Sequence, residues 1–159
     1  MQGDRPFLVD SVMGELVGQG LAVRAMMHPV AEGKAGPRSV IAVLMDPLDA
    51  DQRGRVLDNL KAVLADVYAA VDDFPAMLGL VGRTLAELER TAPDSPDKAE
   101  ALALLRWLEA QRFVFLGARV YEYPRTKNGR WAHEQPAFQP QSGLGILRDP
   151  QRQVLRPRQ

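Results

Sequence analysis

Apolar residues at helical spacing predict a helix near the start of the chain. The predicted helix runs from Pro6, a residue suited to a first helical turn, to Gly20, a typical left-handed stop. Apolar side chains recur between them at intervals of three and four, at Leu8, Val12, Met13, Leu16 and Val17.

Residues 21–30 alternate, which predicts a half-buried strand. One face carries Arg24 and His28, and the other carries Val23, Ala25 and Met27. Residues 31–38 contain two glycines and a proline and are predicted to be a loop between strands. Residues 39–45 are apolar at nearly every position, which predicts a strand that is buried on both faces.

A long helical stripe follows Asp49, a good N-cap residue. The stripe consists of Val56, Leu60, Val63, Val67 and Val71. Phe74-Pro75 is predicted to end or kink this helix. A further helix carries Leu78, Val81, Leu85 and Leu88, and the end of the linker 91–96 caps another helix that carries Leu102, Leu105 and Leu108.

The period changes to two at Phe113, which predicts β structure. Asn128-Gly129 suits a tight hairpin turn with a return strand at 131–134, and 145–148 predicts another short strand before a frayed tail, 149–159. The pattern divides the chain into a domain at 1–74, a helical linker region at 75–112 and a partial β-rich unit at 113–159.

Composition excludes several classes of protein. The 159 residues hold 20 basic and 20 acidic side chains, so the surplus of positive charge that nucleic-acid binding requires is missing. Without cysteine there is no disulfide scaffold, thiolate nucleophile or metal site built on sulfur. The longest apolar run, 40–45, is far short of a membrane span, and the N-terminal residues lead into no secretory segment, so a cytoplasmic location is expected.

Motifs for independent catalysis are also missing. Gly18-Gln19-Gly20 lacks the third glycine of a dinucleotide fingerprint and follows a helix, where that motif would follow a strand. His28 and His133 lie far apart in the sequence, and no short-spaced ligand set accompanies either. The sequence therefore predicts no catalytic, cofactor-binding or metal residues in this chain.

The order helix–strand–strand–helix over 1–74 fits the central part of an α+β sandwich of the βαββαβ, ferredoxin-like type that lacks its first strand. The segment Asp4-Arg5-Pro6-Phe7-Leu8-Val9, followed later by Gly20-Leu21-Ala22-Val23, resembles the first turn of ACT domains. A longer resemblance is to the N-terminal region of the large bacterial NAD-specific glutamate dehydrogenases. It rests on residues 4–12, His28-Pro29-Val30, Leu105-Arg106-Trp107-Leu108, residues 113–117 and residues 143–148, in this order.

The resemblance implies a parent enzyme that converts L-glutamate, NAD and water to 2-oxoglutarate, ammonia and NADH, with its nucleotide fold and catalytic lysines far downstream. It implies a noncatalytic regulatory or oligomerisation role for this segment, with the rest of the parent chain and other subunits of a homo-oligomer as partners. ACT-like domains commonly bind small amino acids where their sheets pair. The residues expected to bind such an effector are Asp4, Arg5, Phe7, Leu8, Arg24 and His28, and Arg5 or Arg24 would hold its carboxylate.

Two alternatives remain open at this point. The chain is either such a regulatory segment or a plain protein-interaction domain without a ligand, which would present the stripe 78–88 to a partner unless that stripe packs on the next helix. A βαββαβ sheet also places its first strand centrally, so residues 39–45 need a neighbour. Either residues 113–123 or a second copy of the chain is predicted to supply it.

Overall fold

The computed structural model describes residues 5–33, 36–110, 113–128, 136–139 and 141–152. The chain forms two compact units, Met1–Val71 and Asp72–Gln159. One helix, α2 (Ala50–Thr91), begins in the first unit and ends in the second. No helix within the described ranges is both long and apolar enough to cross a membrane.

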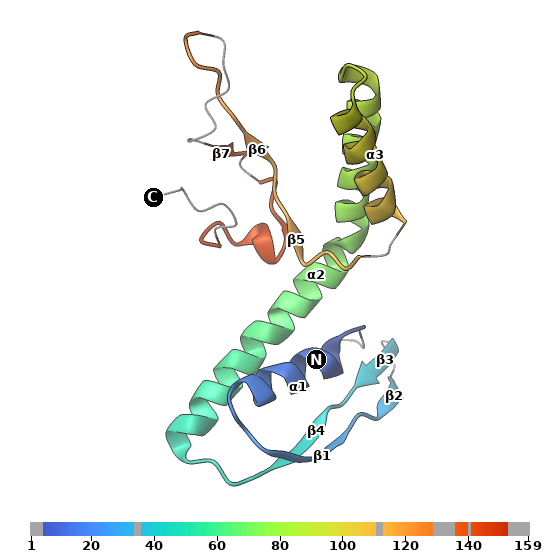
Figure 1. Ribbon diagram of the computed structural model, residues 1–159. Helices are drawn as coiled ribbons and strands as arrows, with labels where there is room; N and C mark the ends of the chain where they lie inside the picture. The colour runs from blue at the N-terminus through green and yellow to red at the C-terminus, as the bar shows by residue number, and fades with distance from the viewer. Residues whose placement is uncertain (1–4, 34–35, 111–112, 129–135, 140, 153–159) are drawn as a thin grey trace. The chain divides into compact units, whose positions relative to one another are not determined.

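The first unit places two helices against a small antiparallel sheet (Figure 1). Its elements are α1 (Leu8–Gly18), β1 (Val23–Met27), β2 (Val30–Gly33), β3 (Gly36–Ser39), β4 (Ala42–Met45) and the N-terminal part of α2. Strand β1 pairs with β4, and β2 pairs with β3 as an extension of the same long hairpin.

The core of the first unit lies between α1, α2 and one face of the β1–β4 sheet. Leu16 is fully buried, with Val12 of α1 and Val56 of α2 packed beside it. Gly20, at φ 74°, ends α1 in the left-handed conformation that the sequence predicts. The predicted helix is thus confirmed; Leu8, Val12 and Leu16 of its stripe are buried, whereas Val17 is 62% exposed.

A bulge in β1 corrects the predicted strand. The register pairs Val23 with Met45 but Ala25 with Leu44, so Arg24 is the extra residue. Beyond it, Ala25 and Met27 lie on the outer face of the sheet, and Met27 is 67% exposed. The prediction that they share a face with Val23 is therefore wrong, because one inserted residue reverses every side chain that follows.

Two further strand predictions are wrong. In the segment predicted to be a loop, 31–38, residues 31–33 belong to β2 and residues 36–38 to β3, with Glu32 paired to Pro37. Strand β4 was expected to be buried on both faces, yet its residues alternate between exposed and half-buried, and Leu44 is 63% exposed. Helices cover only one face of this sheet, so the apolar run does not correspond to double burial.

Helix α2 does not end at Pro75. It begins with the predicted cap, since the Asp49 carboxylate accepts the Gln52 amide at 2.7 Å and the Gln52 side chain accepts the Asp49 amide at 3.0 Å. A proline inside a helix costs about 3 kcal/mol. Tertiary contacts of the adjacent residues offset that cost, since Asp73 bonds to the C-terminal part of the chain and Phe74 packs on Phe115 with ring centroids 6.1 Å apart.

The second unit contains the end of α2, α3 (Pro96–Glu109) and four two-residue strands in its described residues. The strands are β5 (Gly117–Ala118), β6 (Tyr121–Glu122), β7 (Ala137–Phe138) and β8 (Leu144–Gly145), followed by the 3-10 turn η1 (Ile146–Arg148). Ser95 caps α3 as predicted, accepting the Lys98 amide at 3.1 Å. The predicted strand 145–148 is wrong beyond Gly145, because η1 replaces it.

The β-rich part pairs differently from the sequence prediction. Strand β5 pairs with β8, and β6 pairs with β7. The predicted turn at Asn128-Gly129 and return strand 131–134 fall largely outside the described residues. The described strands of residues 113–123 pair within the second unit, and the strand neighbour predicted for β4, either residues 113–123 or a second copy, stays a prediction. In the described part of the chain β4 has a strand neighbour on one edge only, β1.

Candidate functional site

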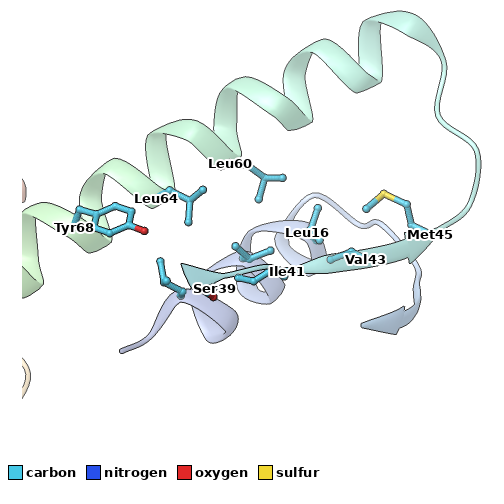
Figure 2. A pocket seen from close by; sticks show the side chains of 10 residues that line it. Leu16, Ser39, Ile41, Val43, Met45, Leu60, Leu64 and Tyr68 are labelled. Atoms are coloured by element: carbon cyan, nitrogen blue, oxygen red, sulfur yellow. The ribbon is translucent and has the colours of Figure 1, made fainter. Parts of the chain in front are cut away.

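The first unit contains an open apolar pocket of about 390 Å³ between its helices and its sheet. Strand β4 and the residues before it form the floor, and α1 and α2 form the walls (Figure 2). The lining residues are Leu8, Val12, Leu16, Ser39, Ile41, Val43, Met45, Leu60, Leu64 and Tyr68. None of them is Asp, Glu, Lys, Arg or His, so the pocket suits apolar side chains.

Polar atoms are confined to one end of this pocket. Ser39 and Tyr68 carry the only hydroxyls among its lining residues, and they lie at the same end in Figure 2. Ser39 Oγ shares a hydrogen bond with His28 Nε2, which ties the β1–β2 connection to the end of β3. Burying an unpaired ionic group beside such a lining would cost several kcal/mol, so the pocket itself is unsuited to the charged ends of a free amino acid.

The structure describes five of the six residues predicted to bind an effector, and of these five Leu8 alone lines the apolar pocket. Leu8 is 3% exposed and lines the pocket as part of the apolar wall. His28 is not among the lining residues, and its Nε2 shares a hydrogen bond with Ser39, which is one of them. Arg24 pairs with Asp46 at 2.6 Å, and both side chains are more than half exposed.

The remaining three predicted residues belong to the turn before α1. Asp4 lies outside the described residues, and Arg5 is exposed. Phe7 is 49% exposed and has φ 68°, a left-handed conformation that is unusual for a bulky side chain. Its carbonyl accepts the Ser11 amide at 3.0 Å, so the strained turn starts α1. Neither Arg5 nor Phe7 is among the lining residues of the pocket.

The second unit is organised around a buried carboxylate that sequence reasoning did not single out as a site. Asp73 on α2 is 7% exposed. Its Oδ2 accepts the Gly145 amide at 2.7 Å and Arg148 Nε at 2.6 Å, while Oδ1 accepts the other arm of the same guanidinium. Asp73 lies inside α2, and its donors come from a turn more than seventy residues further along the chain.

The Arg148 guanidinium lowers the pKa of Asp73 below its usual value, and the Gly145 amide adds to this, against an opposing effect of burial. The same contact raises the pKa of Arg148. Arg148 itself is 58% exposed, so water screens part of the attraction. Gly145 must be glycine here, because a Cβ would lie 2.2 Å from the Leu116 carbonyl oxygen.

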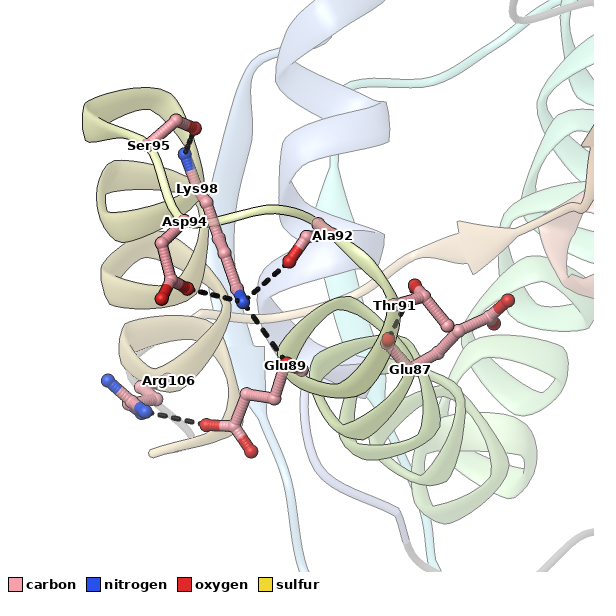
Figure 3. A network of polar contacts seen from close by, with 8 residues as sticks. All are labelled: Glu87, Glu89, Thr91, Ala92, Asp94, Ser95, Lys98 and Arg106. Atoms are coloured by element: carbon pink, nitrogen blue, oxygen red, sulfur yellow. Dashed lines mark hydrogen bonds and ion pairs between the residues drawn. The ribbon is translucent and has the colours of Figure 1, made fainter.

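Two further polar ties hold the second unit. Lys98 Nζ, whose side chain is 12% exposed, donates to the carbonyls of Glu89 and Ala92 at the end of α2 and to the Asp94 carboxylate (Figure 3). This ammonium caps the helix C-terminus, where positive charge is favoured. Arg119 similarly donates to three carbonyls, those of Leu147, Asp149 and Arg152.

The α2–α3 pair also bears on the predicted interaction stripe. Arg106 of α3 pairs with Glu89 of α2 at 2.6 Å, which joins the two helices (Figure 3). Leu78, Val81, Leu85 and Leu88 are all half-buried. Among the residues that the structure describes, no cluster of three or more His, Asp or Glu side chains could hold a metal ion.

Comparisons with known proteins point to one enzyme class. Residues 1–57 match the family model described as the ACT1 domain of glutamate dehydrogenase. The NAD-specific glutamate dehydrogenase of Halomonas elongata is 32% identical over 168 positions, which cover 91% of this chain and 10% of that protein. The enzyme of the same name from Mycobacterium tuberculosis is 29% identical over 164 positions, which cover 89% of this chain and 10% of that protein. The chain spans about a tenth of the length of these curated relatives.

Proposed function

Since the chain corresponds to a segment of the NAD-specific glutamate dehydrogenases and its residues 1–57 match their ACT1 domain, we propose that it is a noncatalytic regulatory and assembly segment of such an enzyme. The parent subunit would oxidise L-glutamate to 2-oxoglutarate and ammonia with NAD. The first unit would be a βαββαβ-type ACT-like domain. The proposed partners are the rest of the parent chain and other subunits, in the cytoplasm.

The apolar pocket is the observation that carries the assembly role. A pocket lined by eight aliphatic or methionine side chains, one serine and one tyrosine binds apolar protein surface better than it binds a zwitterion. Arg24 is the best-placed described cation for an effector carboxylate, yet it already pairs with Asp46. Assembly without a small ligand is therefore the second candidate function, and the same pocket supports it.

Two measurements test this proposal. The parent enzyme should reduce NAD in the presence of glutamate, and the 159-residue chain should not; turnover by the chain alone would contradict the noncatalytic role. Calorimetric titration of the parent enzyme with a panel of amino acids then tests sensing.

An effector held by Arg24 should lose affinity at least tenfold in Arg24→Met. The exposed Arg53→Met of α2 should retain affinity and serves as the control. No heat from any amino acid would remove the sensing role and leave assembly.

A further inference from the structure

The outer face of the β1–β4 sheet is apolar, although the described residues of the first unit leave it uncovered. Helices α1 and α2 pack on the opposite face (Figure 1). The outward residues of the paired strands are Ala25 and Met27 of β1 and Ala42 and Leu44 of β4, and all four are exposed. The solvated face of an antiparallel sheet normally carries polar side chains. A contiguous apolar face of this kind marks an interaction surface.

The bulge at Arg24 produces this face. Without the extra residue, strict alternation from the inward Val23 would direct Arg24 and His28 outward. With the bulge, the outward positions of β1 are Ala25 and Met27, and the Arg24 guanidinium pairs with Asp46 at 2.6 Å. The irregularity of the strand therefore keeps two polar side chains out of the middle of the outer face.

Long and short side chains alternate across the outer face in both directions. Ala25 lies opposite Leu44, and Met27 lies opposite Ala42. Each cross-strand pair thus joins one long side chain to one methyl group, and along each strand a long side chain follows a short one. The two long side chains occupy one diagonal of the face, and the two alanines occupy the other.

A face with this pattern is complementary to itself. When two copies stack face to face about a two-fold axis parallel to the strands, each β4 lies over β1 of the other copy. Leu44 of one copy then faces Ala25 of the other, and Met27 faces Ala42. Long side chains fill the space that the alanines leave, as close packing between two sheets about 10 Å apart requires.

The charged pair at the end of the face fits the same symmetry. Arg24 belongs to β1 and Asp46 directly follows β4, and both side chains are more than half exposed. The two-fold axis places Arg24 of each copy beside Asp46 of the other, so opposite charges meet at this rim. Such exposed pairs contribute little affinity, but they favour one orientation of the two sheets over others.

The size of the face predicts a weak contact for the chain alone. Strands β1 and β4 have five and four residues. Two stacked faces of this size, with their rims, would bury on the order of 1,000 Å² in total, which is near the lower limit for a specific interface. Other contacts between longer subunits would strengthen it by raising the effective concentration of the two faces.

We propose that the outer face of the β1–β4 sheet binds the same face of a second copy of the chain, sheet on sheet, about a two-fold axis parallel to the strands. Leu44 packs on Ala25 and Met27 packs on Ala42 across the contact. This inference rests on the proposed function, because it assigns the assembly role to one surface. The edges of the sheet and the apolar pocket take no part in the contact.

Sedimentation equilibrium of the 159-residue chain tests the contact. The wild type should dimerise with a dissociation constant of about 0.1 mM. Ala25→Leu should weaken the dimer at least about tenfold, because it sets one long side chain against another, Leu44. Ala62→Leu makes the same change at an exposed position of α2 and should leave the dissociation constant unchanged. A wild-type chain that is still monomeric at about 1 mM would overturn the proposal.

Exchanging the two side chains tests the symmetry. The double variant Ala25→Leu/Leu44→Ala again sets one long side chain against one short one, so its dissociation constant should return to within about threefold of the wild-type value. A partner surface other than the same face has no reason to match the exchanged pattern. Slow hydrogen exchange at the buried Leu16 shows in each variant that the first unit is folded. A folded double variant that dimerises no better than Ala25→Leu would refute the proposed axis.

The inference and the proposed function fail in different ways. If the chain dimerises through this face but also reduces NAD with glutamate, the inference stands and the noncatalytic role is wrong. If the chain is inactive and Ala25→Leu dimerises as well as the wild type, the noncatalytic role stands and the inference is wrong.

Discussion

Each of the two units of this chain is stabilised by a different kind of internal contact. In the first unit, Leu16, Val12 and Val56 form an apolar core, and the ion pair of Arg24 is exposed. In the second unit, Asp73 is the buried polar residue, and strands of only two residues are held in place by contacts to its carboxylate and to the Arg119 guanidinium. Apolar packing tolerates an unfilled pocket, whereas a polar tie depends on each partner.

The difference shows how strictly the contacts of each unit specify the groups that can make them. The apolar pocket of the first unit offers packing contacts, which are not directional. The carboxylate of Asp73 can be satisfied only by donors placed as Gly145 and Arg148 are placed. The first unit is thus suited to binding, and the second to holding one local arrangement.

The largest effect is expected from the apolar core. Leu16→Ala should lower the free energy of unfolding of the first unit by about 3 kcal/mol, because it leaves a cavity at a fully buried position. Hydrogen exchange of the β1–β4 amides measures this change. Val17→Ala, on the same helix at a position that is 62% exposed, should change stability by less than about 0.5 kcal/mol. Similar losses in the two variants would show that α1 is not packed as described.

The next largest effect is expected at the buried carboxylate. Asp73→Asn should destabilise the second unit by about 2 kcal/mol, because the Arg148 guanidinium loses its charged partner. Both tryptophans, Trp107 and Trp131, belong to the second unit, so fluorescence-detected urea unfolding reports on it. Asp58→Asn, which removes an exposed pair with Lys61, is the control and should cost less than about 0.5 kcal/mol. If Asp73→Asn left the free energy of unfolding unchanged, packing alone would stabilise the second unit.

A smaller effect is expected from acid. The pKa of Asp73 is lower in the folded state than in the unfolded state, so its contribution is fully present above the usual carboxyl pKa of about 4 and is lost as pH falls through the lower, folded value. The urea midpoint of the second unit should therefore fall with pH more steeply in the wild type than in Asp73→Asn. Parallel pH profiles for the two proteins would contradict the assignment.

The smallest effect is expected at the turn before α1. Phe7→Gly should raise the stability of the first unit by about 0.5 to 1 kcal/mol, because glycine adopts φ 68° without steric cost. Phe7→Ala removes the same ring but keeps the strain, so it should be no more stable than wild type. Thermal unfolding of both variants separates the two contributions. A gain in Phe7→Ala equal to that in Phe7→Gly would attribute the effect to the exposed ring.

Local patterns in the sequence were sufficient for α1, for the start of α2 and for α3. The stripe of α1, the stop at Gly20, and the caps at Asp49 and Ser95 all follow from residues close together in the chain. The similarity to the NAD-specific glutamate dehydrogenases was also recognisable from short motifs in order, and the comparisons find the same similarity. The helix continues through Pro75, contrary to the predicted end, because the usual free-energy penalty for a proline in a helix takes no account of contacts with distant residues.

The pocket and the contacts of Asp73 could not be predicted from local sequence patterns. The pocket depends on which residues of β4 and α2 face each other, and the bulge at Arg24 shows how one extra residue changes that. The ties of Asp73 to Gly145 and Arg148 span more than seventy residues, and no local period marks them.

The sequence by itself determined α1, the start of α2, α3 and the caps at Asp49 and Ser95, because each depends on side chains within a few positions of one another. Only the tertiary structure decided that the helices cover one face of a narrow sheet, and that a single carboxylate holds a distant turn. The physical reason is that strand register, pocket shape and buried ion pairs are set by contacts between segments far apart in the chain, where spacing along the sequence carries no information.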